Sequence, residues 1–227
     1  MKSQALLVLL AASSTLAQGT FQNLGFESPT LPLVPNPFGF VAAADATPGW
    51  TPYVGTNGEN LLYNNFYLGT ASVDLIGPEW TNSTIVIDGS YSVVLQAGVG
   101  NSPGSPGGIA QTEVSIRQTG QVPVGAQSIL FKAHAGFMPL SVSLSGQSIP
   151  IFAVETGPNY ILFGGDISAF GGQTVEFELA ALPPNSNWTI DSIEFSSQAV
   201  PEPSVLTLVA LGSVFLIWRL RHQTRLP

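Results

Sequence analysis

The chain contains no cysteine among its 227 residues. This absence excludes disulfide bonds, thiolate chemistry and zinc sites with cysteine ligands. Any domain that the chain forms is therefore stable without covalent cross-links between side chains.

Basic residues are scarce, and most of them lie at the two ends of the chain. Between residues 18 and 200 only Arg117 and Lys132 are basic, against 13 acidic residues, which gives this region a net charge of −11. Nucleic acid is disfavoured as a partner, because phosphate binding needs clustered lysine and arginine. Divalent cations and neutral glycans remain candidate ligands, and the acidity alternatively only keeps the protein soluble.

Groups that could carry catalysis are also few. His134 is the one histidine between residues 18 and 200, it falls on the polar face of a predicted strand, and no Gly-x-Ser-x-Gly elbow is present. Glu176 and Glu178 share one face of a predicted strand about 7 Å apart, which could mimic a glycosidase pair. We predict no enzyme, with a polysaccharide-acting hydrolase as the alternative.

The N-terminus has the features of a secretory signal peptide. Met1-Lys2 is a short positive start, Ala5 to Ala12 is apolar, and Thr15-Leu16-Ala17 offers small residues to a signal peptidase. We predict cleavage after Ala17.

The C-terminus combines a proline break, an apolar run and a basic end. Pro201 and Pro203 keep a helix from extending upstream. The uncharged run from Ser204 to Trp218 has 15 residues, a helix of about 22 Å, which is short for a hydrocarbon core of about 30 Å. The arginines that follow it predict a cytoplasmic end. The alternative is a core helix of a globular domain.

The chain is thus predicted to have five parts: a signal peptide at 1–17, a β-sandwich domain at 18–196, a linker at 197–203, a transmembrane helix at 204–218 and a basic cytoplasmic tail at 219–227.

Pro201-Glu202-Pro203, the single apolar helix and the basic residues Arg219 and Arg221 together resemble the PEP-CTERM sorting signal of bacteria. In that family an exosortase, a membrane protease-transpeptidase, recognises the signal. The resemblance implies an exosortase partner, a membrane-anchored precursor and delivery to the cell envelope or the extracellular matrix. It covers residues 200–227 and leaves the exported domain without an assigned activity.

The exported region has the pattern of an all-β domain, an antiparallel β-sandwich. Short β-branched and aromatic runs alternate with Gly, Pro, Asn and Ser, and no helical periodicity separates them. Residues 140–154 are predicted to form a hairpin that turns at Gly146-Gln147, and residues 97–108 a flexible surface loop. Further strands are expected at 71–76, 84–87, 91–97, 109–118, 129–135, 159–163, 175–179 and 188–196.

The two ends of this region carry a second resemblance. Asn23 to Glu27, Pro48-Gly49-Trp50 and Trp188 to Phe195 are similar to motifs of the galactose-binding-like jelly roll. Many members of that superfold are carbohydrate-binding modules. The resemblance implies a jelly roll over residues 21–196, with a structural or adhesive role and extracellular polysaccharide as a ligand.

A structural calcium ion is implied by the same resemblance, with Glu27 from the first strand and Asp191 from the last as its ligands. In the last strand, Trp188 and Ile190 share one parity whereas Ile193 and Phe195 share the other. This switch predicts a bulge at Asp191-Ser192 that re-aims the Asp191 side chain. The alternative is that both carboxylates cap turns or face water.

Aromatic residues with asparagines among them gather between residues 48 and 80. Their rings could stack on sugars while amides bind the hydroxyl groups, although such residues are also ordinary neighbours of a core. Trp188 is expected to pack in the core. The candidate glycan-binding residues are Trp50, Tyr53, Tyr67 and Trp80.

Overall fold

The computed structural model describes residues 19–31, 39–64, 70–80, 85–101, 109–134 and 139–200. The predicted signal peptide, the predicted sorting tail from Pro201 onward and Tyr67 lie outside these ranges. Within the same ranges, no helix has the length and apolar character needed to cross a bilayer.

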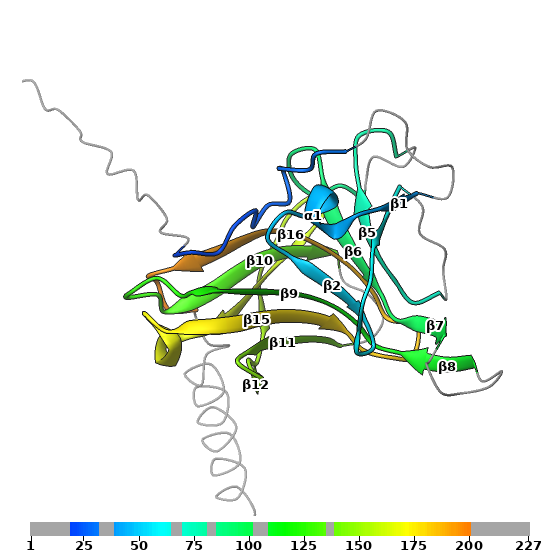
Figure 1. The fold of residues 1–227 in the computed structure, drawn as a ribbon. Coiled ribbons are helices and arrows are strands. Elements are labelled where there is room, and N and C mark those ends of the chain that lie inside the picture. Colours follow the sequence, from blue (N-terminus) through cyan, green and yellow to red (C-terminus); the bar gives the residue numbers. More distant parts are fainter. Residues whose placement is uncertain are drawn as a thin grey trace, which may run out of the picture.

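The regular secondary structure of the described chain is almost entirely β-strand and forms two layers, which confirms the predicted all-β sandwich (Figure 1). Sheet A has the strand order β1 (Phe40–Val41), β4 (Leu61–Tyr63), β5 (Ser72–Ile76), β6 (Ser92–Gln96), β16 (Asn187–Ser196), β10 (Ser128–His134), β14 (Ile161–Asp166) and β13 (Phe152–Thr156). Sheet B has the order β12 (Gln147–Ser148), β11 (Leu140–Leu144), β15 (Thr174–Ala181), β9 (Val114–Gln121), β2 (Thr51–Val54) and β3 (Asn57–Gly58). The remaining elements are a small sheet of β7 (Gly98–Asn101) and β8 (Ile109–Thr112), the helix α1 (Ala43–Ala46) and the 3-10 turn η1 (Ser168–Phe170).

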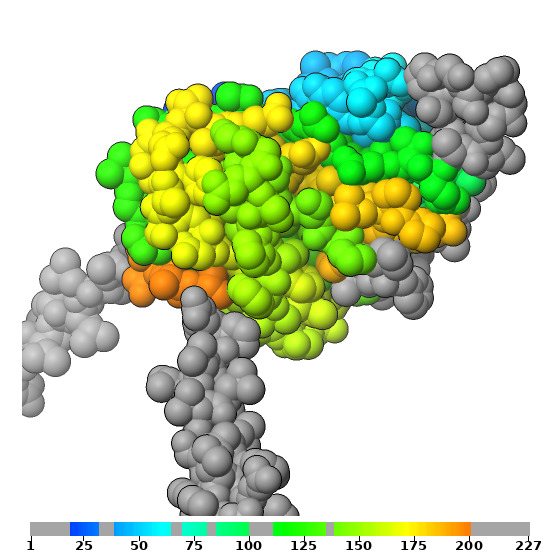
Figure 2. Space-filling view, turned by 90° about the horizontal axis from the view of Figure 1, so that it is seen from below, coloured from blue at the N-terminus to red at the C-terminus, as the bar shows by residue number. Residues whose placement is uncertain are grey.

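Most neighbouring strands are antiparallel, as predicted, but β4 and β5 run parallel, with Leu62 opposite Asp74. Figure 2 views the molecule from the side of sheet B, where β15 in yellow lies next to β11 and β12 in yellow-green. Alternate residues of the central strands point between the sheets and form a single apolar core, whereas the edge strands β12 and β13 are exposed.

Trp50 belongs to this core, so its predicted glycan-stacking role is wrong. The side chain is 3% exposed, and its ring centroid lies 5.6 Å from that of Phe26 and 5.8 Å from that of Phe177. Its indole N–H donates to the carbonyl oxygen of Asn23 at 3.1 Å. A ring enclosed in this way has no free face for a sugar. Trp188 is also buried, as predicted, and packs edge-on against Phe163.

The predicted hairpin at 140–154 is correct only as far as Ser148. Ser145 and Gly146 both have positive φ, 49° and 75°, which is typical of a two-residue type I′ turn. The turn therefore lies one residue earlier than predicted. After Ser148 the chain crosses to the other layer, where β13 pairs with β14 at the edge of sheet A.

Two other predicted segments differ in the structure. Residues 98–101 of the predicted loop form β7, which pairs with β8 through backbone hydrogen bonds that need no large side chains. Residues 85–87, predicted to end a strand, have no strand conformation, because side chains from other segments hold this backbone instead.

The predicted bulge in the last strand is confirmed. Lys132 lies opposite Asp191 and Leu130 lies opposite Glu194, so β16 has one residue more than β10 across this step. Ser192 has a φ of 48°, and the N–H of Ile193 donates to the carbonyl oxygen of Leu24. The bulge therefore joins the last strand to the segment that carries Glu27.

The first half of the predicted linker is attached to the domain. Ser128 Oγ donates to the carbonyl oxygen of Gln198 at 2.7 Å. A Cβ atom added to Gly164 would lie 2.9 Å from Val200 Cγ2 and 2.8 Å from Leu130 Cδ2. A glycine at position 164 thus leaves the space in which Val200 packs on sheet A.

Candidate functional site: a cavity beside the 85–91 loop

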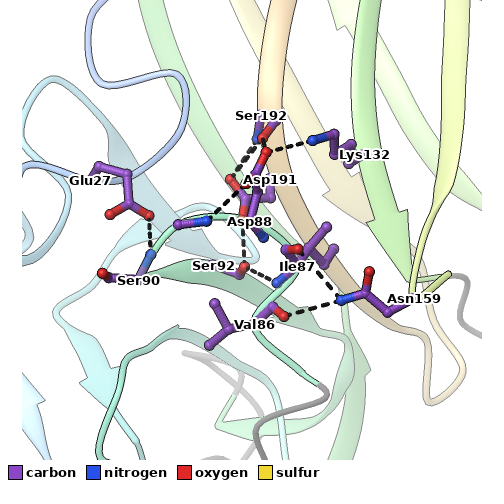
Figure 3. Close-up of polar contacts among 11 residues, drawn as sticks. Glu27, Val86, Ile87, Asp88, Ser90, Ser92, Lys132, Asn159, Asp191 and Ser192 are labelled. Atoms are coloured by element: carbon purple, nitrogen blue, oxygen red, sulfur yellow. Dashed lines mark hydrogen bonds and ion pairs between the residues drawn. The ribbon is translucent and has the colours of Figure 1, made fainter. Parts of the chain in front are cut away.

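Residues 85–91, called the 85–91 loop below, precede β6 and have no regular structure. Side chains from the N-terminal segment, β6, β10, β16 and the turn before β14 all contact it (Figure 3). The loop is therefore positioned by residues distant in sequence rather than by its own conformational preference.

Asp191 is the central support of the loop. Its Oδ2 accepts hydrogen bonds from the backbone N–H of Asp88 at 3.0 Å and from Ser92 Oγ at 2.7 Å, and its Oδ1 accepts one from the N–H of Ser192 at 2.6 Å. The side chain is 1% exposed. Burial raises the pKa of Asp191 to about 6, although these hydrogen bonds favour the ionised form.

Glu27 holds the other end of the loop. Its Oε1 accepts hydrogen bonds from the backbone N–H groups of Ser90 and Tyr91, both at 2.8 Å. Gly89 has a φ of 60°, and a Cβ atom there would lie 2.4 Å from Glu27 Oε1. Glycine is thus required at position 89 both by the backbone and by the carboxylate. Glu27 itself lies in an irregular segment, not in the predicted first strand.

Asp88 projects from the middle of the loop and pairs with Lys132 of β10 (Figure 3). The Lys132 ammonium group also lies 5.0 Å from the ring centroid of Tyr160, and Ser192 Oγ donates to Asp88 Oδ2 at 3.1 Å. The hydrogen bond from Lys132 lowers the pKa of Asp88. Residues 18–200 contain only two basic residues, and one of them fixes this loop.

Asn159 and Ser92 bind the start of the loop. Asn159 Nδ2 donates to the carbonyl oxygens of Val86 and Ile87 at 3.4 Å, and the N–H of Ile87 donates to Ser92 Oγ at 2.9 Å. Loop backbone groups are thus satisfied by side chains in place of a strand ladder.

A cavity of about 360 Å³ lies between this loop and the segment that follows β5. Trp80 forms part of its wall on one side, and the loop forms the other side. The residues that matter for its chemistry are Pro78, Trp80, Val86, Asp88, Gly89 and Ser90. Trp80 thus lines the same space as Asp88, Gly89 and Ser90 of the loop.

Of the predicted glycan-binding residues that the structure describes, Trp80 is the one at this cavity. Tyr53 lies on β2 in sheet B, where the Arg117 guanidinium carbon is 4.4 Å from its ring centroid. Arg117 also pairs with Glu178 at 2.7 Å. Tyr53 therefore belongs to a separate charged cluster on the outer face of sheet B.

The structure does not test the calcium ion predicted between Glu27 and Asp191. Both carboxylates accept hydrogen bonds from N–H groups of one loop. No group of three or more His, Cys, Asp or Glu side chains suited to a metal ion occurs in the described ranges. Glu27 and Asp191 both bind the backbone of the 85–91 loop, and the calcium ion stays a prediction.

The candidates for catalysis lie in two different sheets, His134 in sheet A and Glu176 with Glu178 on one face of β15 in sheet B. His134 is exposed on β10, as predicted, and Glu176 is exposed on β15, whereas Glu178 is bound in its ion pair with Arg117.

Asp88, Lys132 and Asn159, which fix the 85–91 loop, were not identified from the sequence. Asp88-Gly89-Ser90 is recognisable as a turn, but its partners lie 44 to 104 residues away.

No family model and no curated protein matches the chain. A solved structure that resembles it is that of TmCBM61 in complex with β-1,4-galactotriose. The two are 12% identical, the match covers 79% of this chain and 99% of that chain, and the TM-score is 0.39. A likeness of this size carries no argument about ligand or mechanism.

Proposed function

We propose that this protein is an exported, non-catalytic module that binds a neutral glycan in the cavity beside Trp80. The observation that carries the proposal is the position of Trp80 opposite a loop whose backbone is fixed by Glu27 and Asp191. A sugar presents apolar C–H groups to an aromatic ring and hydroxyl groups to polar atoms, and this cavity offers both kinds of contact. Its volume is within the range of small-ligand sites.

The charge of the region supports a neutral ligand. Asp88 is the charged residue in the cavity wall, and the exported region carries a net charge of −11. Anionic polysaccharides would be repelled, whereas uncharged hydroxyl groups can donate hydrogen bonds to the Asp88 carboxylate. The fixed loop also lowers the cost of ordering the site when a ligand binds.

The alternative of a hydrolase has one observation in its favour, since Asp88 and Asp191 are adjacent carboxylates with pKa values shifted in opposite directions. However, Asp191 is buried, and both of its oxygens accept hydrogen bonds from the protein. It could reach a substrate only by releasing the loop. We therefore favour binding over catalysis.

For the domain, we propose the galactose-binding-like jelly roll. Support comes from the two-layer arrangement and from the link between the N-terminal segment and the last strand at Leu24 and Ile193. In this proposal the bulge at Ser192 serves to fix the binding loop.

Trp80→Ala is expected to weaken glycan binding at the cavity at least about tenfold, because it removes the stacking surface. Tyr53→Ala is the matched control, since it removes an aromatic side chain from sheet B and should leave binding unchanged. The measurement is calorimetric titration of the full chain, in a detergent without sugar headgroups, with neutral trisaccharides. Equal affinity in the two variants would contradict the proposed site.

We further propose that the tail sorts the protein, as PEP-CTERM signals do, to the cell envelope or the extracellular matrix. Support comes from the Pro-Glu-Pro motif, the apolar run and Arg219 and Arg221 in the sequence. The described chain packs on sheet A up to Val200, the residue directly before the motif.

Glu202→Ala is expected to leave the precursor uncut and membrane-bound in a bacterium that contains an exosortase. Glu176→Ala, which changes an exposed carboxylate on β15, should be processed normally. Cell fractionation with immunoblotting of the domain distinguishes the two. If Glu202→Ala were released as efficiently as Glu176→Ala, the sorting proposal would be wrong.

A further inference from the structure

A second cavity, of about 460 Å³, lies at the other end of β5. Its wall is formed by the edge of sheet A together with Val54 from the end of β2 in sheet B. The residues that line this cavity include Phe40, Glu59, Asn60, Leu62, Ser72 and Val99.

Phe40 is exposed at the rim of this cavity. The strand β1 has two residues, and since Val41 points into the core, Phe40 must point away from it. Its side chain is 59% exposed, more than that of any other phenylalanine described. A single exposed apolar side chain is ordinary, but Phe40 shares the lining of this cavity with Leu62 and Val99, and an apolar patch of this kind is informative.

Two polar residues line the same cavity as Phe40. Asn60 and Glu59 are exposed residues of the turn before β4, and the N–H of Glu59 donates to the carbonyl oxygen of Pro52 at 3.1 Å, which fixes the turn against β2. An amide offers both donors and acceptors, and a carboxylate accepts from hydroxyl groups. Because the charged group in the wall is acidic, the cavity favours a neutral ligand.

We propose that this cavity is a second glycan-binding site, so that one domain binds two sugar segments; the inference rests on the proposed function of the first cavity. Ser72 lines the second cavity and Gly77 the first, and five residues of extended chain separate them by about 17 Å. A short oligosaccharide occupies one cavity at a time, whereas long polysaccharide chains are cross-linked by the protein. Such cross-linking suits a matrix component.

Titration calorimetry of the full chain with a panel of neutral trisaccharides of glucose, galactose, mannose and xylose tests the second site through its stoichiometry. We expect two sugars per wild-type chain, and one per chain for Phe40→Ala and for Trp80→Ala. Phe152→Ala is the matched control, because it removes a partly exposed phenylalanine from the opposite edge of sheet A. It should still bind two, and thermal melts should show all variants folded.

The possible failures are distinguishable. One sugar per wild-type chain, lost in Trp80→Ala and kept in Phe40→Ala, would overturn the second site and leave the proposed function intact. One sugar lost in Phe40→Ala and kept in Trp80→Ala would instead overturn the first site. Absence of binding across the panel would overturn both.

Discussion

Asp191→Ala is expected to lower the free energy of unfolding by about 3 to 5 kcal/mol. The change leaves three donors without this acceptor, namely the buried hydroxyl group of Ser92 and the partly buried N–H groups of Asp88 and Ser192. Each unsatisfied buried group costs about 1 to 3 kcal/mol, and such costs are not fully additive within one network. Urea unfolding followed by circular dichroism measures the loss.

Asp191→Asn provides the matched control, because asparagine keeps the shape and one acceptor oxygen. We expect it to lose roughly half as much stability as Asp191→Ala. Glu176→Ala, an exposed carboxylate on the outer face of sheet B, should change stability by less than about 0.5 kcal/mol. If Asp191→Ala were as stable as Glu176→Ala, Asp191 could not be the support that the loop requires.

The second large effect concerns Asp74, in the middle of β5. The side chain is fully buried between Leu62 and Val94 of the neighbouring strands. Its Oδ2 accepts a hydrogen bond from Ser72 Oγ at 2.7 Å, while its Oδ1 has no partner in the described part of the chain. Burial raises the pKa of Asp74 to about 7.

Asp74→Asn is therefore expected to stabilise the protein at pH 8 by roughly 2 to 4 kcal/mol and to have little effect at pH 4. The folded state holds the proton more tightly than the unfolded state, whose carboxyl has the ordinary pKa of 3.8. This contribution to stability is complete below about pH 4 and is lost as the pH rises through about 7. Asparagine resembles the protonated acid at every pH.

Urea unfolding of the wild type and of Asp74→Asn between pH 4 and pH 8 checks this expectation. Asp191 also has a raised pKa, but it is present in both proteins, so the difference between their curves isolates Asp74. If the free energies of unfolding of the two proteins changed in parallel with pH, the raised pKa of Asp74 would be contradicted. A difference that grows as the pH is lowered would contradict its sign.

The features that were predicted correctly from sequence are those set by local alternation. The parity switch between Ile190 and Ile193 located the bulge, since a strand can bring both residues to the core only with one extra residue between them. The same reasoning placed Trp188 in the core and His134 on the polar face.

The features that were missed depend on partners distant in sequence. Residues 149–154 continue the alternation of β11, so nothing local shows that the chain crosses to sheet A after Ser148. The sequence around a tryptophan in a loop-rich segment does not show whether its side chain is buried, as that of Trp50 is, or lines a cavity, as that of Trp80 does. Asp88 of the loop pairs with Lys132, which lies 44 residues further along the chain, and no periodicity in the sequence indicates such a contact.

The candidate site was thus only partly predictable. Glu27 and Asp191 were identified as a pair from a resemblance and a bulge, but the resemblance assigned them to an ion. In the structure both carboxylates bind the backbone of one loop, directly opposite Trp80. The physical reason is that backbone N–H groups can satisfy carboxylates, here that of Asp88 for Asp191 and those of Ser90 and Tyr91 for Glu27.

The most direct test of the central claim is amide chemical-shift mapping of the full chain, in micelles without sugar headgroups, titrated with neutral trisaccharides. We expect the indole N–H of Trp80 and the amides of Asp88, Gly89 and Ser90 to shift with the sugar concentration, while those of Tyr53 and Arg117 stay in place. Shifts confined to the outer face of sheet B, or no shifts at residues 85–91, would contradict glycan binding at this cavity.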